Sequence, residues 1–255
     1  MRLCLSLQAK KKNFVLPIHY NRLIQGAVYE NISTELADFL HDKGYLHNGR
    51  SFKFFTFSRL LGRYHLNRDR KQISFPEGAK LYISSPIKEF CTSLMGCMLG
   101  DGEICLGNLS LEVTGITAEK AEVSGESVGL NLISPVVVYS TFEKPGGGKY
   151  TCYFQPGENE FTRLLEANLR RKYEAFYGSE APGGRLTVEQ LNRPRMNITK
   201  YKDTVIKGYT CRMRLNGPRE LLQVAVDAGL GAKNPQGFGC VELEKGTREG
   251  GDLNC

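Results

Sequence analysis

The sequence lacks any apolar run close to the ~20 residues that a membrane-spanning helix requires. It also lacks a secretory signal, because Met1 leads directly into a strand-like alternation of Leu3, Leu5 and Leu7, without a charged region followed by an apolar one. These absences exclude a spanning helix and argue against secretion. We therefore expect a cytoplasmic protein with no membrane partner.

Several short catalytic and metal-binding motifs are also missing. The sequence has no HxH or HExxH pattern and no carboxylate cluster, so metal-dependent hydrolysis has little support. The eight cysteines are scattered without a CxxC pair. Their spacing fits no common structural zinc site and is typical of reduced thiols in a cytosol. We expect neither a metal site nor a cofactor.

What the sequence does contain is an excess of positive charge. The 255 residues carry a formal net charge of +7, and the apolar fraction of 41% is that of a soluble globular protein of one large or two modest domains. The basic residues are concentrated in Lys10–Lys12 and again between Arg193 and Arg214. Two basic segments in a positively charged chain favour a polyanionic partner such as a nucleic acid.

The most informative segment is the glycine-rich loop GLGAKNPQGFG, residues 229–239. Two Gly-apolar-Gly triplets flank a spacer that carries Lys233, and glycine lets backbone N–H groups approach a ligand closely. Because the loop follows a predicted helix and leads into a predicted strand, it is not a dinucleotide-binding fingerprint. A helix C-cap at Gly229 with a turn at Asn234-Pro235 is the alternative, but it accounts for one glycine and not four. The pattern favours a loop that holds a phosphate.

The predicted elements follow the order strand, helix, strand, strand, helix, strand in each half of the chain. In the first half they are strands 2–8, 52–57, 81–84, 104–106 and 109–113 and helices 21–43 and 85–98, with a loop or lid over 59–79. In the second half they are strands 131–140, 150–154, 186–201, 204–215 and 238–243 and helices 158–176 and 218–228. This order predicts an α+β fold of tandem ferredoxin-like (RRM-like) βαββαβ domains, at residues 1–120 and 130–245, with a flexible tail at 246–255.

The predicted strand 204–215 has an apolar and a basic face. Alternation places on one side Val205, Tyr209, Cys211, Met213 and Leu215, and on the other Thr210, Arg212 and Arg214. The apolar side would support the strand and leave the basic side in front. The aromatic signatures of RNA-recognition motifs are absent, so RNA would not be held by base stacking on the sheet.

The glycine-rich loop of this basic chain resembles the C-terminal signature of the CRISPR-associated endoribonucleases that process precursor RNA, within the repeat-associated RNA-binding superfamily. Other stretches resemble the same family, namely GAVYENI, ADFLHDKG, FKFFTFS and LNLISPVVV, so the resemblance spans nearly the whole chain. In that family a Tyr, a His and a Lys in these settings form the catalytic triad. Their counterparts in this sequence are Tyr29, His41 and Lys53.

The resemblance implies a metal-independent, sequence-specific endoribonuclease that acts on CRISPR repeat RNA. The RNA 2′-OH would attack the adjacent phosphorus, leaving a 2′,3′-cyclic phosphate and a 5′-OH, which requires a base, an acid and a cation. His41 would be the acid or the base, Tyr29 its partner at the other oxygen, and Lys53 the cation. Each residue also has a purely structural interpretation, as a packed ring, a helix C-terminal partner or a solvent-facing strand residue.

Other residues compete for these roles or would bind the RNA. His47, next to Arg50, is a rival for His41 if its loop folds inward; His19 and Tyr20 are weaker candidates, and His65 looks like an RNA-facing loop residue. The expected RNA-binding residues are Arg193, Arg195, Lys200, Arg212, Arg214 and Lys233, together with Gly229, Gly231, Gly237 and Gly239.

Two other functions stay open at this point. A non-catalytic RNA-binding subunit of a CRISPR ribonucleoprotein complex would tolerate substitution of His41, whereas a nucleotide-binding enzyme that uses the glycine-rich loop would bind a mononucleotide saturably. The expected partners are CRISPR repeat RNA in a precursor transcript and other subunits of an effector complex. The protein itself would be a monomer or a homodimer.

Overall fold

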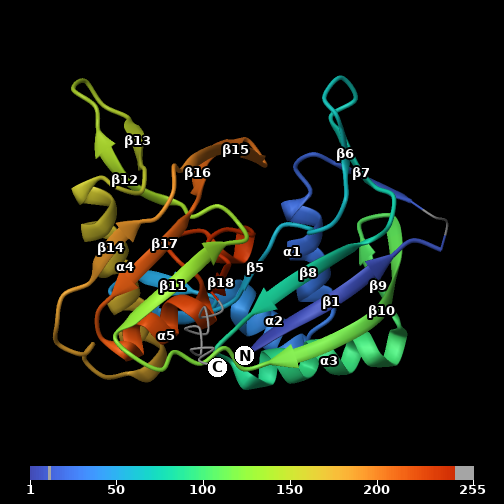
Figure 1. Ribbon diagram of the computed structural model, residues 1–255, viewed down its shortest axis with the longest axis horizontal. Helices are drawn as coiled ribbons and strands as arrows, with labels where there is room; N and C mark the ends of the chain where they lie inside the picture. The colour runs from blue at the N-terminus through green and yellow to red at the C-terminus, as the bar shows by residue number, and fades with distance from the viewer. Residues whose placement is uncertain (11–12, 245–255) are drawn as a thin grey trace, which may run out of the picture.

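The computed structural model describes residues 1–10 and 13–244, which form a mixed α+β fold, as predicted. Figure 1 shows two halves side by side, each built around an antiparallel sheet. Lys11, Lys12 and the predicted tail at 246–255 lie outside the described residues. Within the described part of the chain, no helix has the length and apolarity to cross a membrane.

The first half contains a five-stranded sheet in the order β5-β8-β1-β10-β9. Its strands are β1 (Arg2–Gln8), β5 (Thr56–Phe57), β8 (Ala79–Ser84), β9 (Glu103–Leu106) and β10 (Leu109–Glu119), and its helices are α1 (Asn21–Glu30), α2 (Thr34–Asp38) and α3 (Lys88–Asp101). The alternation predicted for the first strand is confirmed, because Leu3, Leu5 and Leu7 are buried in one core. Ile24 of α1 and Phe90 of α3 belong to the same core, so the sheet anchors both helices.

The predicted continuous helix 21–43 is wrong. Helix α1 ends at Glu30, where the Asn31 side chain donates a hydrogen bond to the Ala27 carbonyl oxygen at 2.7 Å in competition with the helical pattern. Helix α2 and a five-residue π-helix, η1 (Phe39–Lys43), follow after the break. Gly44, with a φ of 64°, ends this segment, as the sequence predicted.

Two further predictions in this half need correction. The predicted strand 52–57 is divided between β4 (Arg50–Phe52), which forms a hairpin with β3 (Tyr45–His47), and β5, because Phe54 between them has a φ of 50°. The predicted loop 59–79 contains the hairpin β6 (His65–Asn67) and β7 (Gln72–Phe75), and β7 also pairs with β2 (Phe14–Pro17).

The second half contains a four-stranded sheet in the order β14-β17-β11-β18. Its strands are β11 (Ser127–Leu132), β14 (Thr187–Gln190), β17 (Arg212–Asn216) and β18 (Val241–Leu243), and its helices are α4 (Asn159–Tyr177), α5 (Arg219–Ala228) and the short 3-10 helix η2 (Asn234–Gln236). Two hairpins project from it, β12 (Val138–Glu143) with β13 (Lys149–Phe154), and β15 (Arg195–Tyr201) with β16 (Thr204–Thr210) (Figure 1).

Three long strands predicted for this half are each divided between the sheet and a hairpin. Proline interrupts two of them, because Pro135 lies between β11 and β12 and Pro194 between β14 and β15. The third is divided at Cys211, between β16 and β17. The predicted apolar face is therefore correct from Cys211 through β17, where Cys211, Met213 and Leu215 are buried, whereas Val205 of β16 is 53% exposed.

The two halves are joined by hydrogen bonds as well as by a shared apolar core. The Thr56 hydroxyl donates to the Phe238 carbonyl oxygen at 2.9 Å, and the Asn21 amide donates to the Gln236 carbonyl oxygen at 2.7 Å. Both acceptors belong to the glycine-rich loop. This loop therefore lies at the junction between the halves.

Candidate active site and glycine-rich loop

The structure brings the three predicted catalytic residues together. Tyr29 lies near the end of α1, His41 lies in η1, and Lys53 directly follows β4. The rings of Tyr29 and His41 meet edge to face with centroids 6.0 Å apart, and the Lys53 ammonium donates to the His41 carbonyl oxygen at 2.9 Å. A helix end, a π-helix and a strand end thus present a phenol, an imidazole and an ammonium at one place.

The Tyr29 ring is partly buried and its hydroxyl is a proton donor. The ring packs edge to face against Phe55 at a centroid distance of 5.5 Å. Burial raises the pKa of Tyr29 to about 12, with a smaller contribution from Tyr201. The phenol therefore keeps its proton at neutral pH.

His41 is open to solvent, whereas Lys53 is partly desolvated. The His41 side chain is 77% exposed, and its Nδ1 lies 2.8 Å from Asp42 Oδ1, which leaves Nε2 free to exchange a proton with a ligand. Burial lowers the pKa of Lys53, and Asp42 opposes that effect. A partly desolvated cation held at the His41 backbone is suited to stabilise negative charge that develops during a reaction.

The rival residues occupy other positions. His47 Nε2 lies 2.9 Å from Glu174 Oε2 on α4, and the ring is largely buried there. His19 accepts the backbone N–H of Lys200 at 3.4 Å, and burial lowers its pKa with contributions from Lys200 and Lys71. Buried Tyr20 accepts the Leu60 N–H at 3.1 Å, and His65 is exposed on β6. It is His41 whose ring meets Tyr29 and whose backbone carbonyl oxygen accepts from Lys53.

The glycine-rich loop is folded on itself and buried. Leu230 N–H donates to the Gly239 carbonyl oxygen, and Gly239 N–H donates to the Pro135 carbonyl oxygen, both at 2.8 Å. All four glycines have φ between 66° and 82°, a range that other residues rarely adopt. A Cβ on Gly239 would overlap the Leu230 carbonyl oxygen, and one on Gly237 would overlap the Phe57 ring. Internal packing accounts for these glycines, and their contact with RNA stays a prediction.

A buried lysine from α4 holds the loop. The Lys172 ammonium, 3% exposed, donates to the carbonyl oxygens of Gly229 at 2.6 Å and Gly231 at 3.0 Å. Burial lowers its pKa to about 7. The sequence pattern showed only an apolar stripe on this helix, so Lys172 was missed.

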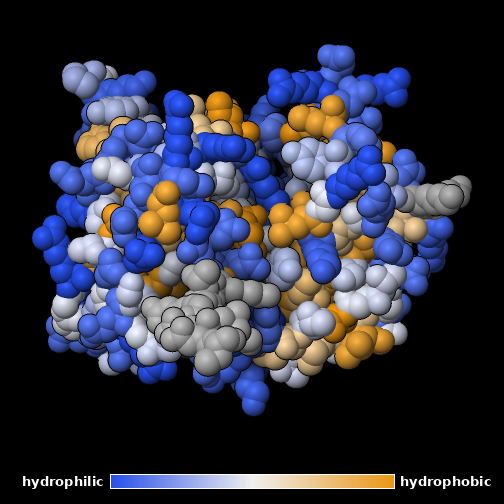
Figure 2. Space-filling model, in the orientation of Figure 1, coloured by the Kyte–Doolittle hydropathy of each residue, from blue (hydrophilic) through white to orange (hydrophobic). Residues whose placement is uncertain are grey.

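The predicted RNA-binding cations fall into two groups. Arg193, Arg195 and Lys200 are exposed on or beside the hairpin β15–β16, where Figure 2 shows hydrophilic and hydrophobic side chains side by side, the latter including Met196 and Ile198 among the exposed residues. Arg212 and Arg214 are also exposed but form ion pairs, with Glu244 at 2.5 Å and with Glu189 at 3.4 Å. Carboxylates therefore compete with phosphates for the second group.

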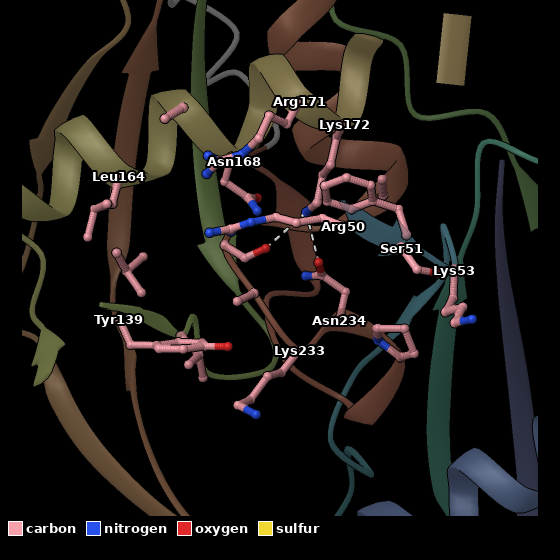
Figure 3. Close-up of a pocket in the computed structure, with 18 of the residues that line it drawn as sticks. Arg50, Ser51, Lys53, Tyr139, Leu164, Asn168, Arg171, Lys172, Lys233 and Asn234 are labelled. Atoms are coloured by element: carbon pink, nitrogen blue, oxygen red, sulfur yellow. Dashed lines mark hydrogen bonds between the residues drawn. The ribbon is translucent and has the colours of Figure 1, made fainter. Parts of the chain in front are cut away.

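A basic pocket of about 740 Å³ adjoins the candidate active site (Figure 3). It lies between the β3–β4 hairpin, α4, β12 and the glycine-rich loop, and its cationic side chains are Arg50, Lys53, Arg163, Arg171, Lys172 and Lys233. The Lys233 ammonium lies over the Tyr139 ring, 5.5 Å from its centroid, and burial lowers its pKa. Only Lys53 and Lys233 were expected from the sequence. The helical spacing of Arg163, Ala167 and Arg171 places two of the other cations on one face of α4, but it does not indicate which element faces them.

Comparisons with known proteins agree on one family. The family description "CRISPR-associated protein Cas6, N-terminal" matches residues 15–117, and "CRISPR associated protein Cas6, C-terminal" matches residues 118–243. The CRISPR-associated endoribonuclease Cas6 1 of Methanocaldococcus jannaschii is 32% identical over 243 residues, which cover 94% of this chain and 92% of that protein.

Solved structures lead to the same family. A CRISPR associated protein Cas6 superimposes with a TM-score of 0.78 at 28% identity, covering 96% of this chain and 99% of the other. A RAMP protein described as binding different RNA substrates superimposes with a TM-score of 0.80 at 25% identity, covering 96% of this chain and all of the other.

Proposed function

Because the chain belongs to the Cas6 family of CRISPR-associated proteins, we propose that it is a metal-independent endoribonuclease that cleaves CRISPR repeat RNA within precursor transcripts. The observation that carries this proposal is the contact of Tyr29, His41 and Lys53 beside a basic pocket. These side chains supply the acid, the base and the cation that attack by a 2′-OH requires. The products are a 2′,3′-cyclic phosphate and a 5′-OH.

The side-chain environments support a division of roles. The exposed His41 imidazole takes the proton of the attacking 2′-OH, and the new bond forms between that oxygen and phosphorus. The bond from phosphorus to the 5′-oxygen breaks, and the Tyr29 phenol, with its pKa raised to about 12, donates a proton to the leaving oxygen. The Lys53 ammonium stabilises the charge on the non-bridging oxygens.

The fold proposal follows from the strand orders. The four strands of a βαββαβ unit can be numbered one to four along the chain. In both sheets they lie side by side in the spatial order two, three, one, four, which is β5-β8-β1-β10 in the first half and β14-β17-β11-β18 in the second. This repetition supports two ferredoxin-like units.

In this proposal the RNA crosses the exposed hairpin β15–β16 and reaches the triad. The protein acts as a monomer or a homodimer, and other subunits of an effector complex are its further partners.

The test is cleavage of end-labelled repeat RNA in EDTA by the wild type and by His41→Ala. A parallel substrate carries a 2′-deoxy nucleotide at the cut site, and His47→Gln is the matched control. We expect one cut, lost with the 2′-deoxy substrate and slowed at least about 100-fold by His41→Ala but not by His47→Gln. Binding without cutting would identify a non-catalytic RNA-binding subunit instead.

A second substrate tests the division of roles. A 5′-bridging phosphorothiolate has a leaving group that needs no acid. It should restore the rate of Tyr29→Phe and leave His41→Ala slow. If the cleavage rate of His41→Ala were restored instead, His41 would be the acid and Tyr29 the base.

A further inference from the structure

We infer that the basic pocket is a subsite for one nucleotide of the RNA, in which Asn168 reads the base and Arg50 and Arg171 hold the adjoining phosphate. This inference rests on the proposed function. It names the part of the substrate that sets where the cut falls.

Two cations of the pocket, Arg50 and Arg171, lack carboxylate partners within the described part of the chain, whereas Arg163 is paired with Glu160 at 2.6 Å. Arg50 and Arg171 form no ion pair within residues 1–10 and 13–244. Burial lowers the pKa of Arg171, and the neighbouring Arg50 lowers it further, while Glu174 opposes them in part. Glu174 is itself in contact with His47. Two guanidinium groups that line one pocket without a carboxylate partner among the described residues favour a bound anion, and a phosphate accepts from both.

On two residues that line the pocket, two buried polar atoms have no hydrogen-bond partner among the residues described. They are Arg171 Nε, a donor, and Asn168 Oδ1, an acceptor. Buried polar groups are normally paired, so these atoms indicate a ligand that supplies one acceptor and one donor. Figure 3 shows Arg50 reaching across the pocket toward α4, which carries Asn168 and Arg171.

One nucleotide supplies both groups. A non-bridging phosphate oxygen accepts from Arg171 Nε, and an exocyclic amino group of adenine, guanine or cytosine donates to Asn168 Oδ1. Uracil has no such amino group and is selected against. Tyr139 lines the other side of the pocket in Figure 3, where the Lys233 ammonium lies over its ring.

The pocket is linked to the chemistry through Lys53. This residue lines the pocket and also contacts His41. A nucleotide bound at Asn168 is therefore close in sequence to the cleaved bond, and its recognition fixes the register of the RNA. Asn168 is a specificity-determining residue and takes no part in bond breaking.

The test measures the Kd of the wild type and of Asn168→Ala for repeat RNAs with one abasic site at each position around the cut. We expect one position at which base removal weakens wild-type binding roughly tenfold and has no effect in Asn168→Ala. Asn108→Ala, in the exposed turn between β9 and β10, is the matched control and should behave as wild type. Replacing that base by its analogue without the exocyclic amine should act like the abasic site.

The inference would be overturned if, at every position, an abasic site weakened RNA binding by the same factor in Asn168→Ala as in the wild type. Asn168→Ser, which keeps a small polar group, repeats the test if Asn168→Ala unfolds at a lower temperature than wild type. Cleavage is recorded in the same samples. If the RNA is cut but its binding shows no dependence on Asn168 at any one position, this inference alone is wrong. If binding depends on Asn168 at one position but the RNA is not cut, the endonuclease proposal alone is wrong. If the RNA does not bind, both are wrong.

Discussion

Lys172 Nζ lies 2.8 Å from Asn234 Oδ1, and both side chains are buried. The Asn234 amide in turn donates to the carbonyl oxygens of Leu230 and Phe238, each at 3.0 Å. A lysine from α4 and an asparagine inside the glycine-rich loop thus satisfy the carbonyl groups that the tight glycine turns direct inward. This pair holds the loop against both halves of the molecule.

We expect Asn234→Ala to lower the free energy of unfolding by about 2 kcal/mol, because two buried carbonyl groups and Lys172 lose their partner. The adjacent Lys233→Ala, which removes a side chain in the pocket but none of these bonds, should change it by less than about 0.5 kcal/mol. Urea unfolding of the two variants and the wild type measures both values. Equal losses would mean that the Lys172–Asn234 pair does not hold the loop.

The stability of the protein should rise with pH through Lys172. Its folded pKa is lowered by burial to about 7, whereas the unfolded chain keeps the proton up to the ordinary value of 10.5. Between these two pH values, unfolding is therefore accompanied by uptake of a proton at Lys172. The contribution of this residue to the free energy of unfolding rises as pH increases from 7, by on the order of 2 kcal/mol at pH 9. Lys172→Met should remove that rise in unfolding experiments at pH 7 and 9. If the free energy of unfolding rose equally with pH in the wild type and in Lys172→Met, the carbonyl groups of Gly229 and Gly231 would keep the Lys172 ammonium protonated over this pH range.

Tyr29→Phe should slow single-turnover cleavage about 100-fold without changing the melting temperature. The variant loses the proton donor but keeps the ring that packs against Phe55 and His41. Tyr45→Phe, which removes a phenol hydroxyl outside the triad from a ring packed against Phe54 and Phe176, is the control. An unchanged rate for Tyr29→Phe would remove this residue from the chemistry.

The rate of cleavage should fall at alkaline pH as Lys53 loses its proton. Because burial lowers its pKa, this fall begins below the ordinary value of 10.5. Lys53→Arg keeps a charged group at all these pH values and should move the alkaline fall to higher pH, even if its rate at neutral pH is reduced. A pH–rate profile of both proteins decides, and coincident alkaline limbs would assign the fall to another group.

The basic residues should differ in their contribution to the salt dependence of RNA binding. Arg195→Ala and Lys200→Ala should each reduce the slope of log Kd against log salt by about 1. Arg212→Ala and Arg214→Ala should reduce it less, because these arginines are paired with Glu244 and Glu189. Titrations at several salt concentrations measure the slopes, and four equal reductions would show that RNA displaces the carboxylates.

Much of the fold was predictable because it depends on local periodicity. The alternation of Leu3, Leu5 and Leu7 predicted a buried strand, and the outward side chains of Arg212 and Arg214 followed from the same period of two. The predictions failed where a single residue ends an element. Asn31, Phe54 and Pro135 each divide a segment that hydrophobic pattern alone reads as continuous.

The candidate site was also predictable only in part. A resemblance in short motifs pointed to Tyr29, His41 and Lys53, but the contact between them depends on the break after α1 and on the π-helix that follows. Arg50, Asn168 and Arg171 escaped prediction because nothing local to α4 indicates which element faces it.

By itself, the sequence determined the positive charge, most strands and helices, and the four glycines of the glycine-rich loop, which all adopt a positive φ. Only the tertiary structure decided that the glycine-rich loop lies between the halves, where Thr56 bonds to a carbonyl group 182 residues away. It also decided that a lysine buried on α4 holds that loop. The reason is physical: periodicity and backbone preference act between neighbours in the chain, whereas burial and hydrogen bonding depend on which distant surfaces pack together.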